Sequence, residues 1–462
     1  MTIAANPDNV AASENRPSLP SRLPLLALCC LLAGLTWAFA PEEPKLRTGL
    51  TLFVLIASLW LTEALDLTVT ALLLPLACVL AGVFNTREAL ASFANPIIFL
   101  FLGGFALASA LVKHGLDRML AAGVLRLAGG RLLAAALLLF AITALLSMWI
   151  SNTAAAAMML PLALGLLNSS SEKPDARTYV FLLLGLAYAS SIGGIGTLVG
   201  SPPNAIAAAQ AGISFAEWLS FGLPIVALLL PLMVASLWLV LRPQLAGRIK
   251  TQPVAIGWTA GRVTALVIFA LTVAGWVGGT SLSAALGIKG DFDSVVALAA
   301  ILALCVTRTV TWRDIEGGTH WGVLLLFGGG LALSQMMGST GASKFLAQEL
   351  VGWVQGAPVL VLMLAVVAFV VMLTELVSNT ASAALLVPIF MSVSAELGLP
   401  PALLATAIAV SASCAFMLPV ATPPNAIAYG TGHVPQALMM RCGLVLNMVC
   451  LGVVTAVVYF AR

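Results

Sequence analysis

Two short polar stretches interrupt an otherwise apolar chain. Residues 151–153 read Ser-Asn-Thr and open the run SNTAAAAMMLP, and residues 378–380 repeat the tripeptide in SNTASAALLVP. A Ser, Asn or Thr ahead of an apolar helical run is a strong N-cap, because its side-chain oxygen accepts an otherwise unpaired N–H of the first turn. Helix N-termini favour anions, and hydroxyl and amide oxygens are hard ligands suited to a small cation such as Na⁺.

A second motif is repeated further along each half. Residues 201–207 read SPPNAIA and residues 422–428 read TPPNAIA. Consecutive prolines cannot continue a preceding helix but suit the first turn of a new one, and the glycines of SIGGIGTLVG upstream of the first copy free the backbone to unwind. The motifs therefore predict two broken helices, at 178–210 and 402–430. Irregular backbone at membrane depth survives only where it lines a cavity or is buried in protein, so we expect the four helix starts to meet at one site.

The composition decides where these motifs lie. The chain has 462 residues, of which 61% are hydrophobic and 8% charged, and a single soluble core cannot bury that much apolar surface. We therefore expect an all-α polytopic membrane protein. The seven cysteines are scattered through apolar segments and are interpreted as reduced packing residues. The net charge of +3 gives no indication of a nucleic-acid partner.

Hydropathy predicts about 11 transmembrane helices and two shorter pieces broken in the middle by Ser-Asn-Thr. The arm from Ala154 to Leu167 has 14 residues, which at ~1.5 Å per residue reaches about 21 Å, short of a ~30 Å hydrocarbon core. Each piece therefore predicts a re-entrant helical hairpin, although two true crossings would also return the chain to the same side. The expected spans are 25–40, 48–63, 67–84, 97–112, 178–210, 217–241, 263–279, 293–310, 321–337, 402–430 and 437–460.

Basic residues favour one orientation in the lipid bilayer. With the N-terminus inside and each hairpin returning to the side it left, 15 of the 21 Lys and Arg residues lie inside. This bias predicts a multi-pass protein of the cell inner (cytoplasmic) membrane with the N-terminus inside and the C-terminus outside. The six basic residues placed outside are Lys45, Arg47, Arg87, Lys289, Lys344 and Arg462.

The repeated motifs belong to a longer internal duplication. The segment FLFLGGFALASAL at 99–111 matches LLLFGGGLALSQM at 324–336, and the two polar motifs follow in the same order. Five full crossings separate equivalent points, so the second copy should be inverted, as in alternating-access transporters. The expected divisions are a cytoplasmic N-terminal tail (1–24), a first helix and loop (25–47), repeat one (48–242, with an inner hairpin at 131–168), a cytoplasmic linker (243–262) and repeat two (263–462, with an outer hairpin at 357–395).

With two Ser-Asn-Thr motifs and two X-Pro-Pro-Asn motifs in this order, nearly the whole chain resembles the divalent anion:sodium symporter family. That resemblance implies a sodium-coupled carrier of dicarboxylates, citrate or sulfate, with at least two Na⁺ sites and an elevator-like sliding movement. It also implies a homodimer in the lipid bilayer.

The resemblance further implies which residues bind. The substrate would contact Asn152, Thr153, Ser201, Asn379, Thr380, Thr422 and Pro423. One sodium would lie among Ser147, Ser151, Asn152 and Gly200, and a second among Thr374, Val377, Asn379 and Ala421. The halves differ where Ser201 stands opposite Thr422 and where Glu375 stands opposite Met148. Glu375 either faces the second ion site or caps the outer end of its hairpin arm.

Other functions are weighed against this one. A sodium-independent dicarboxylate exchanger of the same fold should lack the oxygen ligands that the motifs retain. An anion channel would line a continuous pore with basic residues. An intramembrane enzyme would need a Ser/Lys or Asp dyad or a His-rich motif, which the broken segments lack, so no enzymatic activity is expected. Trp218 falls near a span end and is interpreted as an interfacial anchor.

Overall fold

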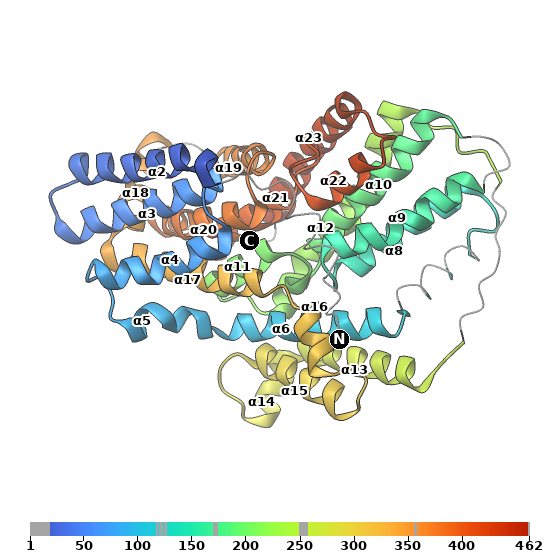
Figure 1. Cartoon of the computed structure of the whole chain (residues 1–462), viewed down its shortest axis with the longest axis horizontal. Coiled ribbons are helices and arrows are strands. Elements are labelled where there is room, and N and C mark those ends of the chain that lie inside the picture. The colour runs from blue at the N-terminus through green and yellow to red at the C-terminus, as the bar shows by residue number, and fades with distance from the viewer. Residues whose placement is uncertain are drawn as a thin grey trace.

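The computed structural model describes residues 19–116, 119, 123, 127–169, 174–248, 257–354 and 358–460. All the regular elements in these ranges are helices, which confirms the all-α class (Figure 1). Most of the expected N-terminal tail, the middle of the cytoplasmic linker at 249–256 and the first residue of the outer hairpin lie outside the described residues.

The helices follow the chain in two series. The first comprises α2 (Leu19–Phe39), α3 (Pro44–Thr62), α4 (Leu67–Leu80), α5 (Thr86–Ala91), η1 (Ser92–Ala94), α6 (Pro96–Lys113), α8 (Leu132–Ser147), α9 (Asn152–Asn168), α10 (Ala176–Gly194), η2 (Leu198–Gly200), α11 (Pro202–Ala211) and α12 (Phe215–Leu241). The second comprises α13 (Ala260–Val277), α14 (Gly279–Leu286), α15 (Phe292–Val306), α16 (Trp312–Gly318), α17 (Trp321–Thr340), α18 (Ala342–Val354), α19 (Val359–Thr374), α20 (Asn379–Glu396), α21 (Pro401–Ala412), α22 (Pro423–Gly430) and α23 (Gln436–Phe460).

The lengths of these helices agree with a polytopic membrane protein. Within the described ranges, eight helices are long and apolar enough to cross a membrane. Other predicted spans are shorter, and α4, α15 and α21 have 14, 15 and 12 residues. Helix α18 was not among the predicted spans, and its polar and charged side chains Lys344, Gln348 and Glu349 are interspersed with apolar ones. A segment of this kind is amphipathic, so its hydropathy alone does not reveal it.

Helix packing interleaves the two halves of the chain. Outside the hairpins, helices of the first half pack against helices of the second: α4 packs against α17, and α6 packs against α15. The hairpins exchange partners in the same way, because α9 packs against α22 and α20 packs against α11. The hairpins differ in their further neighbours, since α20 also packs against α3, α17 and α18, whereas the main neighbours of α9 are α8, α10 and α22 (Figure 1).

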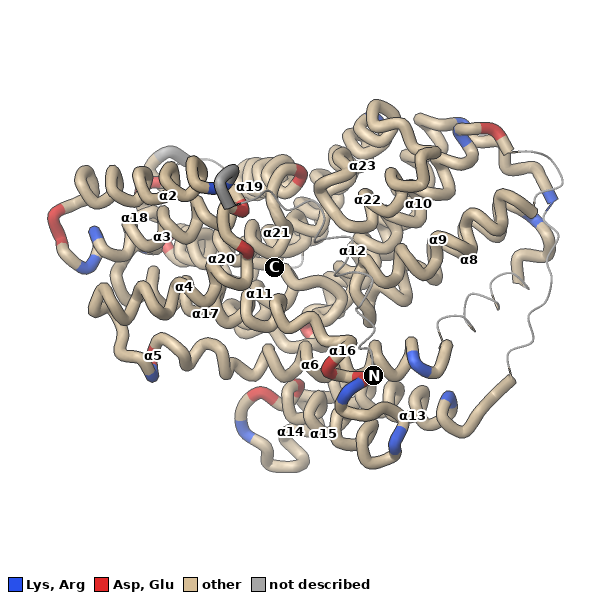
Figure 2. The backbone as a smooth tube through the Cα atoms, viewed as in Figure 1, with Lys and Arg blue, Asp and Glu red and all other residues tan. Residues whose placement is uncertain are grey.

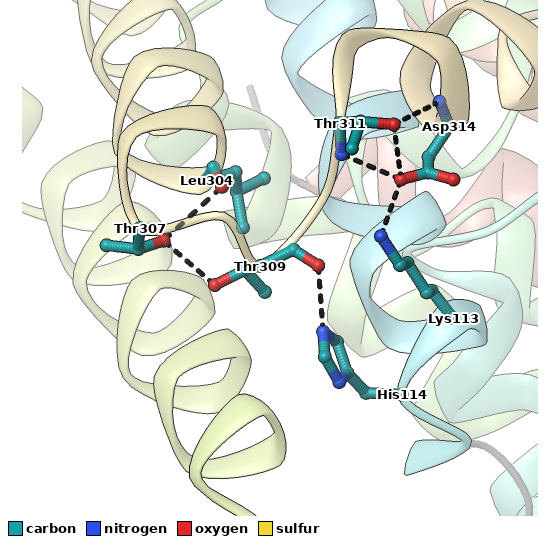
Figure 3. Close-up of polar contacts among 7 residues, drawn as sticks. All are labelled: Lys113, His114, Leu304, Thr307, Thr309, Thr311 and Asp314. Atoms are coloured by element: carbon teal, nitrogen blue, oxygen red, sulfur yellow. Dashed lines mark hydrogen bonds and ion pairs between the residues drawn. The ribbon is translucent and has the colours of Figure 1, made fainter.

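A cluster of polar contacts joins the two halves beside the end of α6 (Figure 3). Lys113 forms an ion pair of 2.6 Å with Asp314, and His114 contacts the carbonyl of Thr309 at 2.9 Å through its Nε2 atom. The hydrogen bond from Lys113 is the main cause that lowers the pKa of Asp314 to about 2. Figure 2 shows that charged residues of this kind lie mainly on connecting segments and helix ends around the rim of the molecule.

The start of the linker after α12 is bound to the base of the first hairpin. The Leu132 amide donates to the Gly247 carbonyl at 3.1 Å, and Arg131 forms an isolated antiparallel bridge with Arg248. Beside them, the Gln244 amide donates to the Thr178 hydroxyl at 3.0 Å. Residues 242–248 therefore belong structurally with α8 and α10.

Candidate functional site: hairpin tips and broken helices

The tip of each hairpin is the start of a helix. Ser151 caps α9 by accepting from the Ala154 amide at 3.2 Å, and Ser378 caps α20 by accepting from the Ala381 amide at 3.4 Å. The N-caps predicted from the Ser-Asn-Thr motifs are therefore confirmed, with serine as the capping residue. Both tripeptides are half-buried.

The asparagine of each tripeptide points its oxygen at a hydroxyl in the other arm of its hairpin. Ser147 donates to Asn152 Oδ1 at 2.6 Å, and Thr374 donates to Asn379 Oδ1 at 2.5 Å. Thr374 also contacts the Ala412 carbonyl at 2.9 Å, at the end of α21. Each half thus places a hydroxyl oxygen and an amide oxygen side by side, which is the donor set that a small hard cation requires.

Two glycines bring the first broken helix against this oxygen pair. A Cβ atom on Gly194 would collide with the carboxamide of Asn152, and a Cβ atom on Gly200 would lie only 2.6 Å from the Gly194 carbonyl oxygen. Side chains are excluded from both positions, because Gly194 lies against Asn152 and Gly200 lies against Gly194. In the second half, no hydrogen bond reaches the carbonyl oxygens of Val377 and Ala421 among the described residues.

The asparagine of each Pro-Pro-Asn motif brackets the unwound loop that precedes it. Asn204 Nδ2 donates to the carbonyls of Gly194 and Thr197, at 2.8 Å each. Asn425 Nδ2 makes the equivalent bonds to Ala415 and Leu418, at 3.1 and 3.0 Å. Both asparagines are fully buried. These motifs were predicted to break the helices and, through Ser201, Thr422 and Pro423, to contact the substrate, but no role was predicted for Asn204 or Asn425. Their repetition in both halves was the signal for the role seen here.

The first loop is fixed by neutral hydrogen bonds. The Thr197 hydroxyl donates to the Met148 carbonyl at the hairpin tip, and the Trp218 indole donates to the Ile195 carbonyl at 2.9 Å. Trp218 is completely buried, so its interpretation as an interfacial anchor is wrong. Its position near the start of a long apolar helix is typical of an interfacial anchor, so the hydrogen bond from its indole to the neighbouring loop could not be predicted.

The second loop is fixed by a carboxylate. Glu375 Oε1 accepts from the amides of Phe416 and Met417 at 2.7 and 2.9 Å, and Oε2 accepts from those of Met417 and Leu418 at 3.1 Å each. Glu375 was predicted either to face the second ion site or to cap the outer end of its hairpin arm. Neither prediction describes these contacts, because the side chain bonds to the loop at 416–418 rather than to its own arm. The Tyr188 hydroxyl of the first half donates to the Phe416 carbonyl at 2.8 Å.

The serine and threonine ahead of the Pro-Pro motifs behave differently. Thr422 caps α22 by accepting from the Asn425 amide at 3.3 Å, whereas Ser201 crosses to the other half and contacts Ser413 with a hydroxyl-to-hydroxyl distance of 3.2 Å. Both are buried, while Pro423 is exposed. Helix α9, which begins with the first tripeptide, packs on α22, which begins with the second Pro-Pro motif. Helix α20, which begins with the second tripeptide, packs on α11, which begins with the first Pro-Pro motif.

Several polar groups of the tripeptides remain without partners. Among the described residues, no hydrogen bond involves the hydroxyls of Thr153 and Thr380 or the Nδ2 atoms of Asn152 and Asn379. The segments 147–153, 194–204, 374–380 and 412–425 contain no Lys, Arg or His. An anion bound here would depend on helix N-termini, neutral donors and nearby cations.

Two repeated halves, each with a hairpin whose second arm begins at a polar tripeptide and with a broken helix, are typical of secondary membrane transporters. A family model described as a citrate transporter matches residues 57–395 and 293–462. The chain belongs to this family, and the resemblance to divalent anion:sodium symporters is confirmed.

Similar sequences are also those of transporters. An uncharacterized transporter of Haemophilus influenzae is 49% identical over 426 residues, covering 91% of this chain and 92% of the relative. The sodium-dependent dicarboxylate transporter SdcS of Staphylococcus saprophyticus is 34% identical over 445 residues, covering 88% and 84%. Among solved structures, the YdaH transporter of Alcanivorax borkumensis matches with a TM-score of 0.56 at 15% identity, over 81% of this chain and 86% of that one, a likeness of fold alone.

Proposed function

We propose that this transporter couples the uptake of a succinate-like dicarboxylate to sodium across the cytoplasmic membrane by alternating access. The observation that carries the proposal is the pair of matching contacts in which Ser147 meets Asn152 and Thr374 meets Asn379. Each contact offers oxygens to a cation and leaves an amide Nδ2 atom for a carboxylate. The name of the SdcS relative supports both sodium dependence and a dicarboxylate substrate.

The binding residues of the proposal come from both halves. The first sodium lies among Ser147, Ser151, Asn152 and Gly200, and the second among Thr374, Val377, Asn379 and Ala421. The substrate carboxylates accept from the asparagine amides and from the hydroxyls of Thr153 and Thr380, with Ser201, Thr422 and Pro423 completing the site. The unpaired state of those amides and hydroxyls in the structure supports this arrangement.

Sodium binds before the dianion in this mechanism. A dianion entering a partly dry site without a basic side chain carries a large desolvation cost, and each bound cation lowers it. Asn152 and Asn379 each serve the ion through Oδ1 and the substrate through Nδ2. Coupling therefore arises because sodium bound at Oδ1 orients the asparagine side chain so that its Nδ2 atom can bind the substrate.

The movement is a sliding of one part of the molecule past the other. The moving part comprises the hairpins α8–α9 and α19–α20 with the broken helices and with α12 and α23, which pack on them. The other helices form a scaffold that joins two subunits in a homodimer. Because the two repeats are inverted, with the N-terminus inside and the C-terminus outside, they can exchange conformations and open the site to one side and then the other. The interleaved packing of α9 on α22 and of α20 on α11 supports a single moving unit.

Uptake by purified protein in proteoliposomes tests the proposal. Radiolabelled succinate should accumulate inside vesicles only with an inward sodium gradient. Inhibition of this uptake by unlabelled citrate, sulfate and longer dicarboxylates should rank the affinities of the site for these anions. Undiminished uptake in choline or potassium buffer would show a sodium-independent exchanger. Equilibration without accumulation above the external concentration would show an anion channel.

A further inference from the structure

Glu375 presents a carboxylate buried among neutral donors. Its side chain is 3% exposed, and besides three consecutive backbone amides it accepts from Asn447 Nδ2 at 2.8 Å. Every one of these contacts is an N–H donor, so the ionised carboxylate satisfies all of them, whereas a proton on either oxygen would face an N–H group. None of the contacting groups is basic. The moving part therefore carries a fixed negative charge that its protein contacts solvate but do not cancel.

This charge belongs to one half only. The equivalent hairpin position in the first half is Met148, and its backbone carbonyl accepts from Thr197 where the second half uses the carboxylate. The rest of the loop geometry is shared, because Asn204 and Asn425 make equivalent brackets. A loop of this shape can therefore be held without a charge, and the carboxylate must be explained by something beyond loop geometry.

The position of Glu375 relates it to the second ion site. It directly follows Thr374, whose hydroxyl meets Asn379 Oδ1, and the loop that it holds leads into Ala421 and Thr422. Three amides turned towards one carboxylate leave the carbonyls of the same loop to face elsewhere, as in backbone nests that bind anions. The Phe416 and Leu418 carbonyls of this loop accept from Tyr188 and Asn425, so the carboxylate orders the backbone that leads to the Ala421 carbonyl, the proposed cation ligand.

We propose that Glu375 is a positioning residue that tunes the second sodium site and makes sodium binding there a precondition for the dianion. The inference rests on the proposed sodium-coupled function. The carboxylate fixes the loop that precedes Ala421, and its negative charge attracts a cation while opposing the carboxylates of the substrate. Sodium at this site offsets that opposition, so the first half, which has no such charge, contributes less to the order of binding.

Sodium binding and transport separate this role from a structural one. Sodium half-saturation is measured without substrate as sodium-dependent thermal stabilisation in detergent, with choline as the replacement cation. Glu375→Gln places an amide N–H against backbone N–H groups and removes the charge. Its sodium half-saturation should rise at least ~10-fold, while the succinate KM at saturating sodium changes less than ~3-fold.

Trp218→Phe is the matched control, since it removes the neutral bond from the indole to the Ile195 carbonyl that fixes the other loop. Its sodium half-saturation should change less than ~3-fold. Asn447→Ala removes one donor to the carboxylate and leaves the residues of the loop unchanged. If Glu375→Gln fails to fold, this variant tests the role of Glu375 in its place. It should raise sodium half-saturation ~2- to 5-fold with no change in the sodium-saturated KM.

The outcomes distinguish the two proposals. Wild-type protein without sodium-dependent stabilisation or sodium-driven uptake would overturn the proposed function itself. Sodium coupling in the wild type, together with unchanged sodium half-saturation in Glu375→Gln or in Asn447→Ala, would overturn only the role of Glu375. A rise in succinate KM that persists at saturating sodium would instead place the carboxylate in the support of the substrate site.

Discussion

The unwound loop at residues 195–197 and its counterpart at residues 416–418 are bracketed by equivalent asparagines but fixed to their hairpins by different chemistry. A threonine hydroxyl and an indole hold the first, and a buried carboxylate holds the second. Backbone geometry is therefore shared between the halves while charge is not. Two structurally equivalent sites therefore need not have the same affinity for an ion or the same place in the order of binding.

The largest effect is expected from adding a negative charge to either tripeptide. Asn152→Asp and Asn379→Asp keep the side-chain shape but replace a donor with an anion, a penalty of several kcal/mol (~100-fold or more in uptake) against a dianion at short range. Asn379→Asp should be the more damaging because Glu375 already charges that half. Succinate uptake, normalised to folded protein, measures the difference. Near-normal transport by both variants would reduce the tripeptides to helix starts, because an acidic residue is tolerated in a first helical turn.

A methyl group on the first broken helix tests whether the halves tolerate the same side chains. Gly194→Ala drives its Cβ atom into the Asn152 carboxamide, whereas the equivalent position in the second half already carries Ala415. We expect Gly194→Ala to lower sodium-driven uptake at least ~10-fold, since overpacking costs ~1–3 kcal/mol. The matched variant Ala415→Gly should change uptake less than ~3-fold. Equal losses in the two variants would contradict the difference in packing.

A smaller effect concerns the helices beneath the loops. A Cβ atom on Gly443 would collide with the Phe416 carbonyl, whereas one on the equivalent Gly222 would lie 3.0 Å from the carbonyls of Ile195 and Gly196. Gly443→Ala should therefore destabilise the protein by ~1–3 kcal/mol, and Gly222→Ala by less. Thermal unfolding in detergent measures both. The opposite ranking would show that the second loop yields more easily than its carboxylate contacts imply.

The smallest effect is expected where charge lies at the surface instead of in the interior. Lys113 and Asp314 are partly exposed, and an ion pair of this kind contributes only ~0–1 kcal/mol. The pKa of Asp314 is lowered from 3.8 to about 2, so the contribution is present above pH ~4 and is lost as the pH falls towards 2. Asp314→Asn should leave stability and uptake unchanged within error at pH 7. A marked loss there would mean that the contact in Figure 3 holds the halves together.

Much of this organisation could be predicted from the sequence. Apolar periodicity located the long helices, and the proline pairs located the breaks, because both signals are local. The contacts of Glu375 and Trp218 could not be predicted, since each joins segments well separated in the chain, 23 residues apart for Trp218 and Ile195 and 41 for Glu375 and Phe416. Helix α18 was missed because its apolar face depends on spacing rather than on mean hydropathy. The assignment of the tripeptides to ions and substrate stays a prediction.

The exchange of partners between the halves has a consequence for how the protein is made. Tyr188 bonds to a carbonyl 228 residues later, and α9 and α11 pack against helices of the second half. At ~5–20 residues per second, roughly 11–46 s of synthesis separates these partners, so the first half enters the lipid with its polar tips unmatched. During that interval the nascent chain depends on the insertion machinery or on quality control to shield its hydroxyls and amides, and truncation after α12 should leave a product that is degraded.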